Sequence, residues 1–396
     1  MLASRMSKVS ISPTTQLNAR VARLKAEGKD IIKLNIGEPD KSTFDYIKVA
    51  GVKAIADGFT KYTVGSGIPE LRRAISEKLE RENGLHYPID QITVTVGGKQ
   101  AVFASIMSLV EEGDEVLLPV PCWVSYTDMI KLAGGTPVFV ETKEAEGYAL
   151  DLDAIRQAVS PRTKAIVICT PNNPTGAVYS YEDLKALGRL ACEHGFYIIA
   201  DEIYEKLVYD GAEHISIASI SPEIFARTIT INGFSKAYAM TGWRVGYAAA
   251  PLEIIKAIQV IQSQTTSNTS SIGQKAALEA LAGPQFDVDR MVDVFAQRRT
   301  YVCSRLAKIP QIRFPAPKGA FYVYLDVSAL IGRTGGGKTL TSSLDIAEYL
   351  LDEALVAVVP GEAFNLAGRI RISYSNSMEN LEKAMDRIEA AVAKLR

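Results

Sequence analysis

Short apolar runs alternate with helical patterns through the middle of the chain. Runs rich in β-branched and apolar residues occur near residues 92, 115, 137, 164, 196, 228 and 244. Segments with the 3.6-residue period of a helix separate most of these runs. Strands that alternate with helices form largely parallel sheets with helices on both faces. The pattern therefore predicts an α/β fold with a doubly wound, mostly parallel seven-stranded sheet.

The two ends of the chain follow a different pattern. Near the amino terminus, a helix is expected at 14–28 and a short strand after it. Beyond the central strands, further patterns predict a long helix at 287–308, strands at 317–326, 356–361 and 369–374, and a closing helix at 378–394. We expect the ends to meet in a smaller, discontinuous α+β domain of residues 1–45 and 286–396. Residues 46–285 would form the large, cofactor-binding domain.

Composition narrows the class of ligand. The 396 residues are 47% hydrophobic and 22% charged, which is ordinary for a globular protein. A net charge of −1 with both signs interspersed argues against nucleic acid or an anionic membrane as partner. Four scattered cysteines without a Cys-x-x-Cys pair argue against a metal site. With neither a signal-peptide pattern nor an apolar run of membrane length, we expect a cytoplasmic protein that binds a small molecule.

One lysine lies between two strands that should be buried. Lys236 is flanked by small and apolar residues in the turn between the strands near 228 and 244. A desolvated ammonium is costly, so this group either reaches water or serves as an amine with a depressed pKa. Taken alone, Lys236 fits a surface turn; its neighbours favour chemistry.

Residues 235–246 read Ser-Lys-Ala-Tyr-Ala-Met-Thr-Gly-Trp-Arg-Val-Gly. This stretch resembles the cofactor-lysine signature of the fold-type-I pyridoxal-phosphate aminotransferases of class I/II, in their aspartate aminotransferase-like branch. In that family the lysine carries pyridoxal 5′-phosphate as an aldimine, and an arginine eight residues later binds its phosphate. Lys236 and Arg244 have this spacing, and partner motifs follow in family order from about Ile36 to Ser373. The resemblance also places Ser235 at the cofactor.

Two glycine-rich segments match the phosphate-binding parts of the family. Gly97 and Gly98 follow a strand and open a helix, where free backbone amides attract an anion, although a plain tight turn is the alternative. The resemblance implies that Gly98 and Lys99 face the phosphate, at a place where relatives often carry a small hydroxyl residue. Tyr62, in the loop at 61–72, matches a tyrosine that reaches the cofactor of the neighbouring subunit. A homodimer with shared active sites is thereby implied.

Four further residues match positions around the cofactor ring. An aspartate at the carboxyl end of a strand, such as Asp201, lies where α/β sheets bind ligands and could keep a ring nitrogen protonated. The alternative, capping of a following helix, fits Glu202 better. The resemblance implies that Trp123 stacks on the ring, and that Asn173 of Asn-Pro-Thr-Gly and Tyr204 contact the phenolic oxygen. The structural alternatives are that Trp123 packs in the core and that Asn173 is only a turn residue.

A glycine and an arginine match the substrate-binding positions of the family. Gly37 of Gly-Glu-Pro and Arg371 of Arg-Ile-Ser-Tyr match positions that hold the substrate carboxylate, beside Trp123 and Asn173. A guanidinium binds a carboxylate with two parallel hydrogen bonds, which suits this role. A solvated edge strand is the alternative. Arg369, on the same face of that strand, is expected to serve as scaffold.

A second phosphate-binding pattern is not expected to bind a nucleotide. Residues 332–339 satisfy G-x-x-x-x-G-K-T, the phosphate loop of nucleotide hydrolases. Too few residues follow for the remaining strands and the magnesium-binding acid of such a domain. We expect a mobile glycine loop instead.

The resemblance implies an aminotransferase that moves an amino group between an L-amino acid and a 2-oxo acid by a ping-pong route. Lys236, once released, would act as general base and then acid, with Asp201 and Tyr204 as the other catalytic residues. Aspartate and 2-oxoglutarate are the expected pair. Aromatic amino acids, alanine or prephenate, or the chemistry of a β-lyase with the same fold, remain alternatives. The sequence does not place the residue that reads the substrate side chain.

Overall fold

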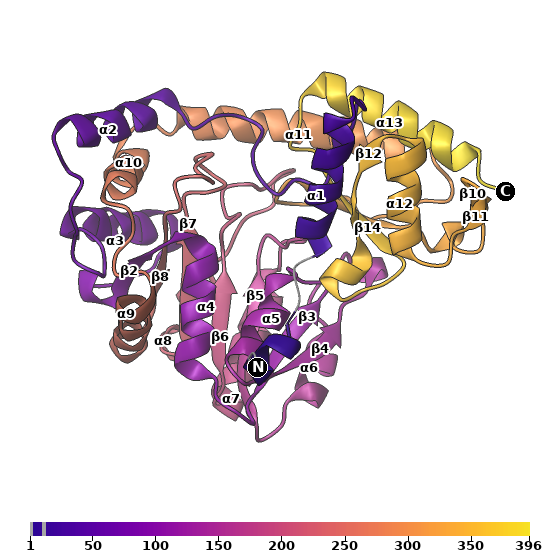
Figure 1. Cartoon of the computed structure of the whole chain (residues 1–396). Coiled ribbons are helices and arrows are strands. Elements are labelled where there is room, and N and C mark those ends of the chain that lie inside the picture. The colour runs from indigo at the N-terminus through magenta and orange to yellow at the C-terminus, as the bar shows by residue number, and fades with distance from the viewer. Residues whose placement is uncertain (1–2, 10–12) are drawn as a thin grey trace.

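The structure is a computed structural model that describes residues 3–9 and 13–396. Its centre is a seven-stranded sheet (Figure 1). The strands follow the order β2 (Ile92–Thr95), β8 (Gly246–Ala249), β7 (Thr228–Gly233), β6 (Tyr197–Asp201), β5 (Thr163–Cys169), β3 (Glu115–Val120) and β4 (Thr136–Glu141). Only β8 runs antiparallel to its neighbours. The predicted α/β fold with a mostly parallel seven-stranded sheet is confirmed.

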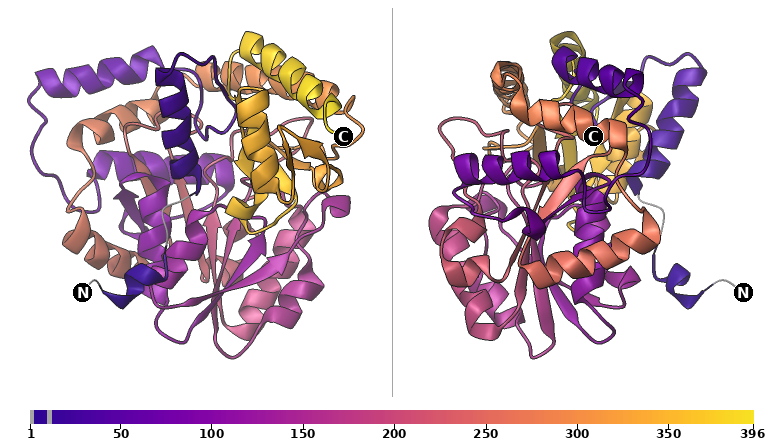
Figure 2. Two further views of the ribbon diagram at one scale, coloured as in Figure 1. Left: turned by 45° about the vertical axis from the view of Figure 1, so that its right-hand side comes forward. Right: turned by 90° about the vertical axis from the view of Figure 1, so that its left-hand side faces the viewer.

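Apolar side chains cover both faces of this sheet because successive residues of a strand point to opposite sides. In β5, Ala165 and Val167 belong to one buried cluster, whereas Ile166 and Ile168 belong to a second. Helices shield the sheet on both sides (Figure 2). The helices within residues 45–282 are α2 (Asp45–Ala56), α3 (Pro69–Asn83), α4 (Gly97–Leu109), α5 (Ser125–Leu132), α6 (Leu152–Ala158), α7 (Tyr181–His194), α8 (Pro222–Phe225), α9 (Leu252–Thr265) and α10 (Ser271–Ala282), of which α2 packs against α10.

Segments from both ends of the chain lie together beside the sheet (Figures 1 and 2). They comprise α1 (Pro13–Ala26), β1 (Ile32–Lys33), α11 (Phe286–Leu306), β9 (Tyr322–Asp326), α12 (Ser343–Glu353), β12 (Val356–Ala357), β13 (Val359–Pro360), β14 (Arg369–Ser373) and α13 (Met378–Ala393). β14 pairs with β13 and β9 in an antiparallel sheet, and β1 pairs in parallel with β12. Arg20 of α1 also binds Asp352 of α12 at 2.9 Å. The domain limits after residues 45 and 285 stay a prediction.

The glycine-rich segment at 332–339 differs from the expected loop. β10 (Thr334–Gly335) and β11 (Lys338–Thr339) form an antiparallel hairpin. Gly336 and Gly337, with φ of 57° and 81°, make its tight turn in the left-handed region. Lys338 Nζ lies 3.1 Å from Asp345 and 3.2 Å from Glu348 on α12. The expected loop is therefore a hairpin that contacts the helix, and its mobility stays a prediction.

Short 3₁₀ turns complete the elements: η1 (Ser4–Ser7), η2 (Ile89–Gln91), η3 (Glu144–Glu146), η4 (Ile217–Ser219), η5 (Ser328–Leu330) and η6 (Gly361–Phe364). Among residues 3–9 and 13–396, none of the helices combines the length and the apolar character that crossing a membrane requires. A cytoplasmic location stays a prediction.

Candidate active site

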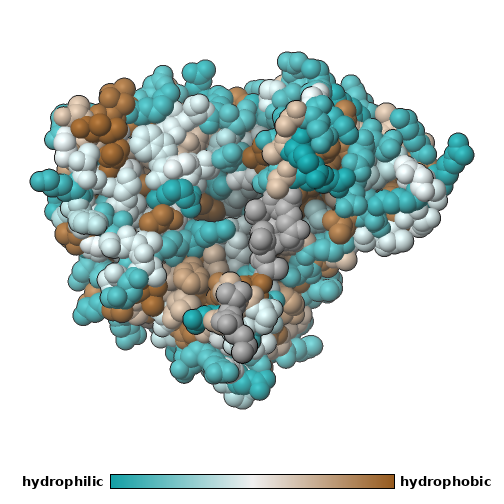
Figure 3. All heavy atoms as spheres, in the orientation of Figure 1, coloured by the Kyte–Doolittle hydropathy of each residue, from teal (hydrophilic) through white to brown (hydrophobic). Residues whose placement is uncertain are grey.

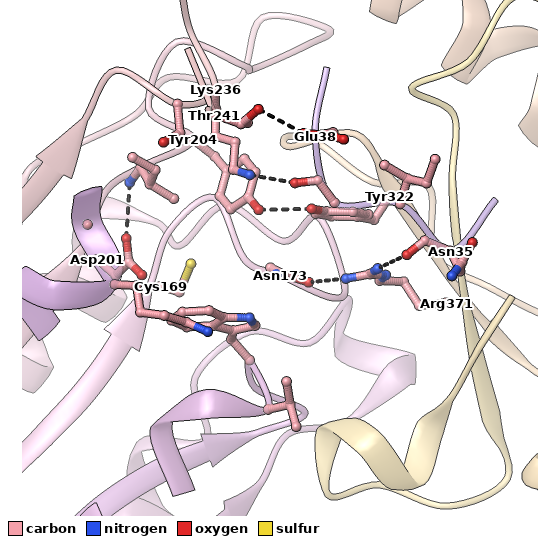
Figure 4. A pocket seen from close by; sticks show the side chains of 18 of the residues that line it. Asn35, Glu38, Cys169, Asn173, Asp201, Tyr204, Lys236, Thr241, Tyr322 and Arg371 are labelled. Carbon is pink, nitrogen blue, oxygen red and sulfur yellow. Dashed lines mark hydrogen bonds between the residues drawn. The ribbon is translucent and has the colours of Figure 1, made fainter. Parts of the chain in front are cut away.

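A cavity of about 530 Å³ opens between the carboxyl ends of the sheet strands and the antiparallel sheet of β9 and β14 (Figure 4). Most of the residues singled out in the sequence line it: Gly37, Gly98, Lys99, Trp123, Asn173, Asp201, Tyr204, Ser235, Lys236, Arg244 and Arg371. They come from segments spread over more than 330 positions of the chain. Tyr62 does not line it and is 89% exposed.

Lys236 stands in the loop between β7 and β8. Its amine donates a hydrogen bond to the carbonyl oxygen of Gly37. Desolvation lowers the pKa of Lys236 to about 8, opposed by nearby Glu38 and aided by the positive charges of Arg371 and Arg244. An amine with a pKa near 8 is partly uncharged at neutral pH, so it serves both as nucleophile and as proton carrier.

The lysine loop is held in a strained shape. Ala239 and Arg244 adopt left-handed φ angles of 51° and 56°, which side chains other than glycine rarely take. Two hydrogen bonds fix the loop: Thr43 Oγ1 donates to the carbonyl oxygen of Ala239 at 2.7 Å, and Trp243 Nε1 donates to Thr43 Oγ1 at 2.9 Å. The amino-terminal segment thereby sets the position of the amine.

Asp201 ends β6 and is only 6% exposed. It accepts hydrogen bonds from the Tyr126 hydroxyl at 2.7 Å and from the amide of Ile203 at 3.3 Å. Burial raises the pKa of Asp201 to about 6, although both hydrogen bonds act in the opposite direction. In the part of the chain that the structure describes, no cation forms an ion pair with it. A buried carboxylate of this kind fits a ligand that brings a positively charged nitrogen.

Arg371 on β14 is the complementary case, being 4% exposed. Its Nη1 donates to Asn173 Oδ1 at 2.9 Å and its Nη2 to the carbonyl oxygen of Asn35 at 3.0 Å. Both acceptors are uncharged, and no carboxylate within residues 3–9 or 13–396 pairs with it. Desolvation lowers the pKa of Arg371. A buried guanidinium held by neutral acceptors fits a ligand carboxylate.

Arg369, two positions earlier on the same strand, is used differently. It lies 3.0 Å from Asp326 and 3.2 Å from Glu144. Two carboxylates of the protein already compensate its charge, and it does not line the cavity. The geometry thus separates a scaffold arginine from one that faces the cavity.

The amino terminus of α4 forms the other end of the cavity. Gly97 has φ +75°, and a Cβ there would lie 2.6 Å from Arg244 Nη2. A Cβ at Gly246 would lie 2.5 Å from the amide nitrogen of Gly98. The glycines therefore let a guanidinium and strand β8 approach the free amides of the helix. Amides and a guanidinium together, with Ser235 nearby in the cavity wall, form a cradle for a phosphate.

Lys99 lies between this phosphate cradle and the ring of Trp123. Its Nζ is 4.9 Å from the centre of the Trp123 ring. Desolvation, together with the positive charge of Arg244, lowers the pKa of Lys99. Trp123 packs edge-on against Tyr126, with ring centres 5.3 Å apart.

Sequence reasoning missed several contributors. Tyr126 fixes Asp201, Asn35 supplies a carbonyl oxygen to Arg371, and Tyr322 lies within 2.9 Å of the Tyr204 hydroxyl. The position of Tyr126, three residues after Trp123 at the start of a helix, was an available signal. Asn35 and Tyr322 gave none, because only the pairing of β9 with β14 and the path of the amino-terminal segment bring them here.

Glu202 does not take the alternative role of capping a helix. A turn follows β6 instead, and the fully buried carboxylate accepts from Ser216 Oγ at 2.7 Å and lies 3.2 Å from His214 Nε2. The alternation of the strand turns Glu202 away from the side of Asp201.

Comparison with known proteins gives a consistent picture. The family model for aminotransferase class I and II matches residues 29–388. An aspartate aminotransferase of Geobacillus stearothermophilus is 44% identical over 98% of both chains. An aspartate/prephenate aminotransferase of Cereibacter sphaeroides is 47% identical over 100% of this chain and 99% of its own. The crystal structure of the Rhizobium meliloti aspartate aminotransferase superposes with a TM-score of 0.96 at 42% identity, covering all of both chains. The chain therefore belongs to the class I and II aminotransferases.

Proposed function

We propose that this protein is a pyridoxal 5′-phosphate-dependent aminotransferase that takes aspartate as amino donor and 2-oxoglutarate as acceptor. The observation that carries the proposal is a pair of buried, uncompensated charges. Asp201 and Arg371 face one cavity, and Lys236 lies in the same cavity. Burying an unpaired charge costs several kcal/mol, roughly 3–5 where a partner is missing. Such charges fit a site whose ligand brings both a cationic nitrogen and a carboxylate.

The residues present fit the cofactor at each of its polar groups. The amides of Gly97 and Gly98 with Arg244 would hold the phosphate, and Asp201 the ring nitrogen. Trp123 would cover one face of the ring, as the sequence predicted. Asn173 uses Oδ1 for Arg371, so a contact with the phenolic oxygen would come from its NH₂ group. When bound, the cofactor supplies an electron-accepting ring that spreads negative charge from the substrate α-carbon.

The chain itself supplies binding and proton transfer. Arg371, oriented by Asn173 and Asn35, would hold the substrate α-carboxylate. Lys236 Nζ would take the proton from the α-carbon, and its pKa of about 8 lets it release that proton again at neutral pH. Asp201 stays mostly ionised above its pKa of about 6, so it favours a protonated ring nitrogen.

The choice of a dicarboxylic substrate rests on the remaining cations of the cavity. Lys33 and Lys99 line it in addition to Arg371, Arg244 and Lys236. With Arg371 on the α-carboxylate and Arg244 at the phosphate, either lysine could meet a side-chain carboxylate. Aspartate aminotransferases are among the relatives. The aspartate/prephenate relative makes prephenate, also a dicarboxylate, the second candidate acceptor.

We further propose a homodimer that completes the site. Three apolar residues of α2 are spaced three apart and exposed: Val49, Val52 and Ile55. Apolar side chains gather over this part of the surface in Figure 3. Exposed Tyr62 and Val64 follow in the next loop. An exposed apolar stripe of this kind supports a contact with a second copy, to whose phosphate Tyr62 would reach.

The visible absorption spectrum tests the function. The purified protein with added cofactor should turn yellow, bleach with aspartate and recover with 2-oxoglutarate; recovery with prephenate would establish the second acceptor. A band that never bleaches with any amino acid would favour a lyase. No band at all would overturn the proposed role of Lys236.

Arg371→Lys should lower kcat/KM for aspartate about 100-fold. Lysine keeps the charge but loses the planar pair of donors, and each lost charge-assisted hydrogen bond costs about 1.5–3 kcal/mol. Steady-state kinetics measure the effect. Arg369→Lys is the matched control and should stay within about threefold of wild type, because that residue binds Asp326, Glu144 and the carbonyl oxygen of Gly368 and does not line the cavity. Equal loss in both variants would contradict the assignment of the carboxylate to Arg371.

Capture of the cofactor by the apoprotein should accelerate as pH rises through about 8 and then level off. Below that pH the Lys236 amine is protonated and not nucleophilic, whereas above it the amine is free. The rate at which the yellow band appears, measured from pH 6 to 10, checks this. Nα-Acetyl-lysine is the reference, because its free side-chain amine is unperturbed and titrates near pH 10.4. A rate that keeps rising to pH 10 would show that burial does not lower the pKa of Lys236.

A further inference from the structure

Tyr322 joins Tyr204, which the resemblance places at the phenolic oxygen of the cofactor, to Arg371, which the proposed function assigns to the substrate carboxylate. It is fully buried on β9 and lines the cavity. Its hydroxyl lies 2.9 Å from the hydroxyl of Tyr204, and the Arg371 guanidinium lies 4.3 Å from the centre of its ring. Figure 4 shows Tyr322 between the two side chains. No role was predicted for it from the sequence.

The number of protons fixes the direction of the tyrosine hydrogen bond. A phenol has one proton to donate and can accept at its oxygen. If Tyr204 gives its proton to the phenolic oxygen of the cofactor, its bond with Tyr322 must be one that it accepts. Tyr322 then has to be the donor. In the described part of the chain, Tyr204 is the hydrogen-bond partner of the Tyr322 hydroxyl.

We propose that Tyr322 is a positioning residue with two functions, an inference that rests on the proposed function. Its hydroxyl donates to Tyr204 and so directs the single proton of Tyr204 to the cofactor. Its ring supports the guanidinium of Arg371 and so holds the substrate clamp in place.

Strand pairing explains why one residue serves both groups. β9 and β14 are antiparallel neighbours, with Tyr322 opposite Ser373 and Tyr324 opposite Arg371. Tyr322 and Arg371 are therefore diagonal neighbours, within reach of a ring and a long side chain. Tyr204 instead follows β6 of the large sheet. The bond between the tyrosines thus connects the two sheets at the cavity.

The surroundings of Tyr322 keep its hydroxyl protonated, so that it can donate, and they leave space for it. Desolvation raises the pKa of Tyr322, so the phenol stays protonated at neutral pH, although Arg371 acts in the opposite direction. A Cβ at Gly37 would lie 3.2 Å from the hydroxyl oxygen. The glycine at this position gives the hydroxyl its space.

Three variants of the holoenzyme test the proposal. Tyr322→Phe removes only the hydroxyl. It should raise the pH at which the bound chromophore changes colour by about 0.5 to 1 unit, the worth of one neutral hydrogen bond. Without the Tyr322 hydroxyl, Tyr204 is a weaker hydrogen-bond donor. It then stabilises the charged phenolic oxygen of the cofactor less, and the pH of the colour change rises. The dissociation constant for maleate, a dicarboxylate that cannot react, should stay within about twofold because the ring remains.

Tyr322→Leu removes the ring as well and should weaken maleate binding about tenfold, as expected for loss of a desolvated cation–π contact. Tyr374→Phe is the matched control. Its hydroxyl is also buried but donates to the carbonyl oxygen of Ala320, outside the cavity lining. That variant should change neither the colour transition nor maleate binding.

The outcomes distinguish a failure of the proposed role of Tyr322 from a failure of the proposed aminotransferase function. A coloured, active wild type whose transition matches that of Tyr322→Phe overturns the donor role while the aminotransferase stands. Unchanged maleate binding in Tyr322→Leu overturns the role of the ring. A wild type that never becomes coloured overturns the proposed function, and the inference falls with it. The conservative phenylalanine variant keeps the test decisive if the leucine variant does not fold.

Discussion

Lys236→Ala should lower the turnover number of transamination by at least about 10⁴-fold. The amine has two tasks in the proposed mechanism: it bonds to the cofactor and it carries the proton at the substrate α-carbon. Positioned acid–base catalysis alone contributes about 10²–10⁴-fold, and loss of the nucleophile adds to it. The fold should survive, since removal of a partly desolvated amine leaves the surrounding hydrogen bonds of the loop in place.

Coupled assays with aspartate and 2-oxoglutarate measure this loss, and thermal unfolding measures stability. Lys338→Ala is the matched control, because that lysine binds Asp345 and Glu348 on the hairpin side of α12. It should keep full activity. A Lys236→Ala protein that retains even one tenth of wild-type turnover would refute the central assignment.

Asp201→Asn should reduce kcat about 10²–10³-fold while the protein still binds the cofactor through Lys236. An amide cannot compensate a positive charge on the ring nitrogen, and breaking such a buried pair costs about 3–5 kcal/mol. The adjacent buried acid supplies the control: Glu202→Gln, whose contacts are Ser216 and His214, should lower kcat by less than about fivefold.

The same substitution should stabilise the apoprotein at neutral pH. The pKa of Asp201 is raised to about 6 from an ordinary value of 3.8, so the folded state binds its proton more tightly than the unfolded chain does. The carboxyl thus favours folding below pH 3.8, and this contribution is lost as pH rises to about 6. Above that range the ionised group opposes folding, and asparagine removes the penalty. A lower kcat with a higher apoprotein Tm at pH 7 would mark Asp201 as functional; a fall in both would mark it as structural.

Local patterns were sufficient for the sheet and for much of the cavity lining. All seven strands lie near their predicted places. For the inner strands the reason is that a strand buried on both faces needs a continuous apolar run, whereas the edge strand β4 is partly exposed. Lys236, Arg244 and Asp201 stand out because each places a charge beside such a run. The distinction between Arg371 and Arg369 came from the resemblance, and the two have different partners in the structure.

What the sequence left out depends on contacts between distant segments. Tyr322 looks like any aromatic residue of an alternating strand, and its neighbours are set by the register of β9 against β14. The hairpin at 334–339 was missed because its glycines satisfy a loop pattern equally well, and Lys338 finds its carboxylates only after α12 has formed. The contacts of Glu202 with Ser216 and His214 likewise follow from the path of the chain after β6.

The segment after β1 has a consequence for the order in which the molecule is completed during synthesis. The carbonyl oxygens of Leu34 and Asn35 accept hydrogen bonds from Ser373 and Arg371, residues made more than 330 positions later. On the ribosome, the large sheet has all its strands once β8 has emerged, yet the early segment still lacks its partners. A nascent chain would therefore carry a finished sheet and an unfinished catalytic centre until Arg371 and Ser373 have been made.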